Sequence, residues 1–365
     1  MNARHFVVPF ALAVAIGGCG GEAPAPTASV VATPPPPPAA AAPPAEPQRA
    51  MPAIEHAPIE AHVADASEAC RGKSADANAK PALAIHRWVD AQGVTHYSDQ
   101  APTTSVSAHR VLEAPPPAPI EVTAKGYDAA LPSDLQQRAI VDALAVQRVF
   151  RDALGIADPA SARINIVFVR EASAYSRLVG AGALAASAGA YVPPQRTIYV
   201  RMQADAETGF EVLRHEITHA LIHELVGNLP IPLNEGLAEY FRRYRAAGMG
   251  GQIDLSSDRA ALVAAAPAGE GSDALVELLA HAGTDFYAAD RERRYAEAYA
   301  LIAVLMQSPA GTAALHETLA RQRAAPCAPI AAETILDQRY PGGLAALAAD
   351  WAGFLRDPPA VVRAY

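Results

Sequence analysis

The sequence predicts an α+β protein in which a few strands precede a long helical region. The run 163–170 is rich in β-branched residues, and 197–202 has the composition of a second strand. Between 206 and 225, apolar residues recur at the spacing of a helix that buries one side. We expect no strands after residue 202, and the later pattern predicts helices near 272–282, 293–308, 312–323 and 343–356.

Residues 1–18 have the outline of a secretory signal peptide, with a basic start at Arg4 and an apolar stretch over 6–16. That stretch is too short for a comfortable membrane-spanning helix. The sequence Ile16-Gly17-Gly18-Cys19 resembles a bacterial lipobox, which implies cleavage before Cys19 and lipidation of that cysteine. No aspartate follows Cys19, so analogy with lipoprotein sorting favours the outer membrane and leaves the leaflet open. A plain secretory peptide or an uncleaved anchor is the alternative.

Two proline-rich segments separate the signal peptide from the rest of the chain. Residues 19–62 are mostly alanine, proline and small polar residues, and include the run Pro34–Pro38. Such a composition cannot bury a core and predicts a disordered, extended tether. A second segment over 113–124, with prolines at 115–117, is expected to be a hinge.

Between these segments, residues 80–112 are expected to form a small domain. Aromatic and apolar residues alternate on both sides of the turn Asp90–Gly93, which predicts two short antiparallel strands. The pattern W-V-D-x-x-G-x-x-x-Y-S-D, which begins at Trp88, resembles a short domain of unknown function common in bacterial envelope proteins. That resemblance implies no known ligand. Trp88 and Tyr97 are expected to form a mini-core, with a small recognition face as the alternative.

The last segment, 125–358, is expected to be the largest domain. The sequence Pro132-Ser133-Asp134-Leu135-Gln136 has a capping-box outline and predicts a helix that ends at Gly155. A helix is also expected over 172–179. The glycine- and alanine-rich segment 180–190 is expected to be a mobile rim or a loosely packed loop.

The most informative motif is His215-Glu216-Ile217-Thr218-His219, on the helix expected over 206–225. Residues four apart lie on one face of a helix, so the two imidazoles can bind a single metal ion. Glu216 then projects beside the ion, where its carboxylate can activate a water molecule. The alternative is a pair of histidines that face solvent or form hydrogen bonds in the core.

A catalytic zinc ion takes three protein ligands and leaves one position open. Pro230 and Pro232 interrupt the helical pattern, and a second helix is expected to begin near Leu233 and to close with the arginine-rich tail 242–245. The first turn of this helix carries Glu235, the predicted third ligand. His223, which is expected to cap the end of the first helix, Glu239 and His281 are weaker candidates for that place.

Two further residues of the second helix have predicted roles. Glu239 lies one turn after Glu235 and can accept the other ring N–H of a ligating histidine. The alternative for Glu239 is an exposed ion pair with Arg242 or Arg243. Gly236 leaves room for close approach of another helix.

These residues resemble the gluzincin metallopeptidases, and within them the peptidase MA-like family with H-E-x-x-H followed by E-G-x-A-x-Y. The stretches 189–193, 197–200 and 295–301 are also similar to that family, so the resemblance covers roughly 125–356. It implies a zincin-like fold, in which a small sheet lies over the metal-binding helix and a helical lobe follows. It does not imply an aminopeptidase, because the G-A-M-E-N motif is missing.

The expected reaction is hydrolysis of a peptide bond by a water molecule on one Zn²⁺ ion, which His215, His219 and Glu235 hold while Glu216 acts as the base. The expected substrate is a protein or peptide, in the bacterial cell envelope. Tyr299, or Tyr295 on the same late helix, is the candidate donor to the oxyanion. The alternative is a catalytically inactive zinc-binding lipoprotein that acts as a scaffold or interaction module.

Charge and cysteine content bound the remaining possibilities. A net charge of −9 and a pI near 5.7 argue against a nucleic-acid-binding surface. The chain is expected to be monomeric and to reach the membrane through its lipid. Once Cys19 is assigned to lipid, Cys70 and Cys327 remain and could pair in an oxidising compartment. The sequence does not decide whether they form this disulfide.

Overall fold

The fold is α+β, as predicted, with three small sheets and several helices in the part of the chain that the structure describes. The predicted signal peptide, Cys19, the tether 19–62 and Cys70 all lie outside that part. The computed structural model describes residues 85–90, 94–98, 101–102, 107–112, 120–156, 162–180, 186–247, 250–267, 272–281, 283–287 and 290–365.

The N-terminal sheet contains the predicted hairpin and one strand that was not predicted. Strands β1 (Ile85–Val89) and β2 (Thr95–Ser98) pair antiparallel, with Trp88 opposite His96 and their rings 5.4 Å apart. Asp90 closes the turn, because its Oδ1 accepts a hydrogen bond from the Val94 N–H at 2.8 Å. Strand β3 (Ser107–Leu112) pairs with the other edge of β1. Its mixture of polar and small residues gave no strand pattern.

The central sheet has the order β4-β5-β7-β6. Strands β4 (Glu121–Gly126), β5 (Arg163–Val169) and β7 (Thr197–Arg201) are parallel, whereas β6 (Gly189–Val192) is an antiparallel edge strand. Strand β4 begins within the segment predicted as a hinge over 113–124. Its alternating burial is that of an edge strand, but it was not predicted because it has only one β-branched apolar residue, Val122, and directly follows the proline-rich segment.

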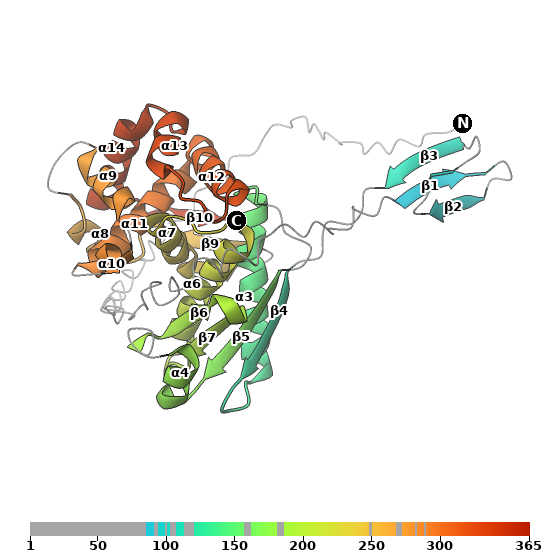
Figure 1. Ribbon diagram of the computed structural model, residues 1–365, viewed down its shortest axis with the longest axis horizontal. Coiled ribbons are helices and arrows are strands. Elements are labelled where there is room, and N and C mark those ends of the chain that lie inside the picture. Colours follow the sequence, from blue (N-terminus) through green and yellow to red (C-terminus); the bar gives the residue numbers. More distant parts are fainter. Residues whose placement is uncertain are drawn as a thin grey trace, which may run out of the picture. The chain divides into compact units, whose positions relative to one another are not determined.

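Helices cover both faces of this sheet (Figure 1). On one face lie α3 (Ser133–Asp152) and α6 (Ala206–Leu225), and on the other lies α4 (Ala172–Val179). In β5, Ile166 and Phe168 pack into the hydrophobic core on the side of α3 and α6. Val167 and Val169 pack with α4 on the other side. Burial on both faces explains the continuous β-branched run that predicted this strand.

The capping box predicted for α3 is wrong. The N-cap residue is Pro132, and no side chain caps the helix, because Ser133 is already its first helical residue. Gln136 donates its amide N–H to the Ala124 carbonyl at 2.8 Å and so ties α3 to β4 instead. The helix ends at Asp152, and Gly155 follows with a φ of 64°, which favours glycine.

The expectation that no strands follow residue 202 is also wrong. After α7 (Ile231–Arg242), strands β8 (Tyr244–Ala247), β9 (Gly250–Asp254) and β10 (Val362–Ala364) form a sheet of order β10-β9-β8. The predicted helical arginine tail over 242–245 therefore stops at Arg242. The strands are short, and β9 pairs both with its sequence neighbour β8 and with β10 from the far end of the chain, so the sequence pattern did not predict this sheet.

The remaining helices gather on the side of α6 and α7 away from the central sheet (Figure 1). The four predicted helices correspond to α9, α11, α12 and α14, whereas α8, α10 and α13 were not predicted. Their bounds are α8 Arg259–Ala264, α9 Asp273–Ala280, α10 Gly283–Tyr287, α11 Arg291–Gln307, α12 Pro309–Ala324, α13 Ala332–Arg339 and α14 Gly343–Arg356.

Close packing of α7 against α11 depends on Gly236, as predicted. A Cβ atom at this position would lie 2.4 Å from the carbonyl oxygen of Ala298, so no other residue fits without moving a helix. Within the described residues, no single helix is long and apolar enough to cross a membrane; α11 and α12 meet that test only when taken together, across a bend of 117°.

Candidate metal centre

Helix α6 places His215 and His219 one turn apart, with their Nε2 atoms 3.0 Å from each other. Both side chains are buried. The helix starts firmly, because the Asp205 carboxylate accepts a hydrogen bond from the Thr208 N–H at 2.9 Å. The two imidazoles are therefore held on a rigid helix and point toward the same place.

Helix α7 brings Glu235 to the same place, after the turn made by Pro230 and Pro232. Its Oε2 lies 3.4 Å from Nε2 of His215 and 3.6 Å from Nε2 of His219. Ligands at about 2.0–2.1 Å from a tetrahedral zinc ion are roughly 3.3–3.4 Å apart, so this triangle has the size of three zinc ligands.

The chemical state of these atoms also fits a bound cation. Glu235 is fully buried, and among the described residues its Oε2 has no hydrogen-bond donor, only the two imidazole nitrogens. A buried carboxylate oxygen without a donor is costly unless a cation compensates it. These three side chains are also the one group of possible metal ligands found in the described part of the chain, and they could hold a metal ion.

Each ligand is oriented by a neighbour on its far side. The Nδ1–H of His219 donates to Oδ1 of Asn234 at 3.0 Å, and Nδ1 of His215 lies 3.2 Å from Oε1 of Glu239. With the proton on Nδ1, the Nε2 lone pair is free to bind a metal. The Tyr287 hydroxyl donates to Oε1 of Glu235 at 2.8 Å, which leaves Oε2 for the ion.

The buried carboxylates close to His215 change the pKa of its imidazole. Burial lowers the pKa of His215, but the nearby carboxylates of Glu235 and Glu239 outweigh that effect and raise it to about 10. A metal ion that binds here would compete with a proton on His215.

Glu216 lies beside the ligands and is held by the edge of the sheet. Its Oε2 accepts a hydrogen bond from the backbone N–H of Tyr191 in β6 at 2.9 Å. Gly189 permits this approach, since a Cβ there would lie 2.4 Å from Val212 and 3.0 Å from Cγ of Glu216. Burial raises the pKa of Glu216 above its ordinary value, and the nearby imidazoles His215 and His219 oppose the shift.

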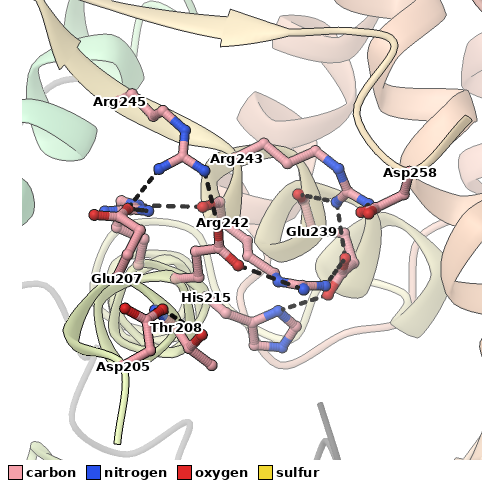
Figure 2. Close-up of polar contacts among 11 residues, drawn as sticks. Asp205, Glu207, Thr208, His215, Glu239, Arg242, Arg243, Arg245 and Asp258 are labelled. Atoms are coloured by element: carbon pink, nitrogen blue, oxygen red, sulfur yellow. Dashed lines mark hydrogen bonds and ion pairs between the residues drawn. The ribbon is translucent and has the colours of Figure 1, made fainter. Parts of the chain in front are cut away.

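Glu239 combines the two roles that the sequence left open. It is buried, with one oxygen toward His215 and the other, Oε2, toward Arg242 at 3.1 Å and Arg243 at 2.8 Å (Figure 2). The alternative prediction, an exposed ion pair, is right about the pairing with Arg242 and Arg243 and wrong about the exposure. The carboxylate therefore connects an imidazole to two buried guanidinium groups.

The structure separates the two candidate tyrosines. Tyr299 lies in the core, where its hydroxyl donates to the Leu255 carbonyl at 3.2 Å and its ring carries the guanidinium of Arg243 at 4.0 Å. Tyr295 packs against His215 instead, with ring centroids 6.4 Å apart. The oxyanion donor predicted at Tyr299 is therefore misplaced, because its hydroxyl points to a backbone carbonyl outside the site.

Two of the weaker ligand candidates, His223 and His281, lie elsewhere. Nδ1 of His223 is 3.0 Å from the Tyr191 hydroxyl and 3.2 Å from Glu224. His281 pairs with Arg294. Neither belongs to the ligand group. His223 lies in the last turn of α6, where a helix cap was expected.

Sequence reasoning missed Asn234, Tyr287 and the Tyr191 N–H. Asn234 directly precedes Glu235 and faces His219, because Asn234 and Glu235 follow the same turn at Pro230 and Pro232. Tyr287 comes from the short helix α10, more than fifty residues after Glu235, and no local pattern marks it. The Tyr191 N–H is a backbone group, for which a sequence carries no signal.

Comparison with known proteins identifies only the small N-terminal domain. Residues 81–125 match the model of the domain of unknown function DUF4124, as the W-V-D-x-x-G-x-x-x-Y-S-D pattern suggested. That domain is generally associated with the bacterial envelope or periplasm, which agrees with an envelope location. No curated protein matches the chain. Cys327 is disulfide-bonded, and its predicted partner Cys70 lies outside the described residues.

Proposed function

We propose that this protein is a zinc-dependent peptidase of the bacterial envelope. The observation that carries the proposal is the convergence of His215, His219 and Glu235 in a triangle with sides of 3.0, 3.4 and 3.6 Å, with the Glu216 carboxylate on the same helix. Two imidazoles and one carboxylate form a common ligand set of catalytic zinc, which leaves a fourth position for water or substrate.

When bound, the zinc ion would supply a lowered pKa for water, from about 15.7 to about 7, and would polarise the scissile carbonyl. The Tyr191 N–H holds one oxygen of Glu216, so the carboxylate is oriented before substrate arrives. Its other oxygen would take a proton from the attacking water and pass it to the leaving amine. Burial raises the pKa of Glu216, which suits a base that works near neutral pH.

Tyr295 is the better of the two tyrosines as donor to the oxyanion. Its ring lies against His215, and burial together with the nearby carboxylates of Glu235 and Glu239 raises its pKa well above the ordinary value. The hydroxyl therefore keeps its proton and can donate it in a hydrogen bond.

The arrangement around α6 supports the resemblance to gluzincins. A sheet lies on one side of the helix with an antiparallel edge strand, β6, beside Glu216, and a helical lobe lies on the other side (Figure 1). We propose a zincin-like fold on this basis. Lipidation at Cys19 and attachment to the outer membrane remain part of the proposal.

The decisive test separates the base from the ligands. Glu216→Gln should retain one equivalent of zinc, because Glu216 is not a ligand, but should lower peptide turnover by about 10²- to 10⁴-fold. The control is Glu333→Gln on α13, an exposed position that should change neither property. Zinc is measured by metal analysis and turnover by mass spectrometry of a peptide library. Zinc binding without cleavage by the wild type would instead favour the scaffold function.

A further inference from the structure

Glu239 must take one rotational position to serve His215. Only Oε1 lies near Nδ1 of His215, at 3.2 Å, whereas Oε2 lies between Arg242 and Arg243 (Figure 2). A buried carboxylate that turned away would leave the imidazole without its acceptor and free to rotate. Whatever fixes Oε2 therefore fixes the direction of the His215 lone pair.

Arg243 is the better fixed of the two arginines. Its Nη1 donates to Oε2 of Glu239 at 2.8 Å and to the Glu239 backbone oxygen at 2.6 Å, and Nη2 donates to Oδ2 of Asp258 at 2.7 Å. The guanidinium also lies over the ring of Tyr299, 4.0 Å from its centroid. A planar group with fixed N–H directions suits these contacts, and a lysine could not make them all.

Arg242 is held less completely. Its Nη1 contacts Oε2 of Glu239 at 3.1 Å, and its Nη2 lies 3.6 Å from Glu211, beyond hydrogen-bonding distance. Arg245, three residues later, pairs with Glu207 and Glu211 and is half exposed, at 53%. Arg245 thus belongs to the same chain of charges without a contact to Glu239 in Figure 2, which makes it a matched control.

We propose that Arg243, supported by the ring of Tyr299, is a positioning residue for the metal site. It keeps Glu239 turned so that Oε1 receives the Nδ1–H of His215, and Nε2 of His215 then faces Glu235 and His219. This inference rests on the metal-binding part of the proposed function and is independent of peptidase activity. It also gives Tyr299 a role: the ring is the platform for Arg243.

The experiment measures the zinc dissociation constant of the full chain by competition with a chromophoric chelator. Arg243→Lys keeps the charge and should weaken zinc binding by about 10- to 100-fold, the range for loss of a group that orients a ligand. Arg245→Lys should stay within about threefold of the wild type. In a Glu239→Gln background, Arg243→Lys should add less than about threefold, because the residue through which it acts is already changed.

Three results would overturn the inference: an unchanged zinc constant for Arg243→Lys, an equal loss for Arg245→Lys, or the same loss in both backgrounds, which a purely structural role would give. If Arg243→Lys does not fold, Tyr299→Leu tests the platform and Tyr299→Phe, which retains the ring, is its control. Tyr299→Leu should weaken zinc binding and Tyr299→Phe should not; equal constants for the two would contradict the inference. Wild-type protein that binds zinc but cleaves no peptide would contradict the peptidase alone.

Discussion

The first half of helix α6 and the cluster around its two histidines compensate acidic side chains in opposite ways. In the first half, which we call the balanced half, the protein supplies its own cations. Glu207 is paired with Arg138, Arg214 and Arg245, and Glu211 accepts a hydrogen bond from Arg245 at 3.0 Å. Each of these carboxylates is therefore neutralised by a guanidinium group within the fold.

In the cluster around His215 and His219, the unbalanced half, Glu216 of α6 and Glu235 of α7 have imidazoles and neutral donors as neighbours in place of arginines. Glu216 receives the Tyr191 N–H, and Glu235 receives the Tyr287 hydroxyl. Among the described residues, neither forms an ion pair with an arginine or lysine. Buried carboxylates need compensation, and we propose that a metal cation supplies it here. The contrast between the carboxylates at the start of α6 and those beside the histidines is the strongest physical argument for a metal ion.

Breaking the balanced half should have the largest effect on stability. Arg214 is 1% exposed and donates to Asp142 at 2.9 Å and to Glu207 at 2.9 Å. Arg214→Leu leaves Asp142 buried without its guanidinium and should lower the free energy of unfolding by about 3–5 kcal/mol. Urea denaturation of the metal-free protein measures this. The double variant Arg214→Leu with Asp142→Leu should recover part of the loss; a double variant less stable than the single one would contradict the pairing.

Filling the unbalanced half should stabilise the protein by a smaller amount. Zinc at a hundred times its dissociation constant should add about 2.7 kcal/mol to the free energy of unfolding, and a chelator should remove it. Glu235→Ala deletes the third ligand and should abolish the gain. Arg214→Leu with Asp142→Leu, at the other end of the helix, should retain it. A gain of equal size in Glu235→Ala would place the zinc elsewhere.

How much the sequence predicted depended on the distance between partners along the chain. His215, Glu216 and His219 lie within five residues on a regular helix. Glu235 lies at the start of the next helix, after the chain reverses direction. Their convergence follows from helix geometry and from prolines that fix the break. Glu239 comes four residues after Glu235 and so lies on the same face of α7. Its approach to His215 could therefore also be expected.

Partners that depend on tertiary packing could not be predicted. Tyr295 and Tyr299 are four apart on α11, and helical spacing alone cannot say which of them meets the site. Packing of α11 against α7 turns Tyr295 toward His215 and places Tyr299 under Arg243. The sheet β8–β10 was missed for the same reason, because β9 pairs with a strand more than a hundred residues away.

The smallest expected effect is the acid sensitivity of the balanced half. Burial acts to raise the pKa of Glu207, but hydrogen bonds from Arg138 and Arg214 outweigh it and lower the pKa to about 2, from an ordinary value of 4.5. A carboxyl group with a lowered folded-state pKa stabilises the protein above its unfolded-state pKa, and this contribution disappears as the pH falls from about 4.5 toward 2. The side chain is 34% exposed, so solvent screening keeps the effect small.

Metal-free wild type should therefore lose more stability between pH 5 and pH 3 than Glu207→Gln does, because the glutamine variant has no proton to gain there. Glu333→Gln, at an exposed position on α13, should follow the wild type across the same range. Chemical denaturation at each pH measures the difference. If Glu207→Gln and the wild type lose equal stability on acidification, the ion pairs of Glu207 contribute nothing measurable. The contrast between the balanced and unbalanced halves would then rest on Arg214 and Asp142 alone.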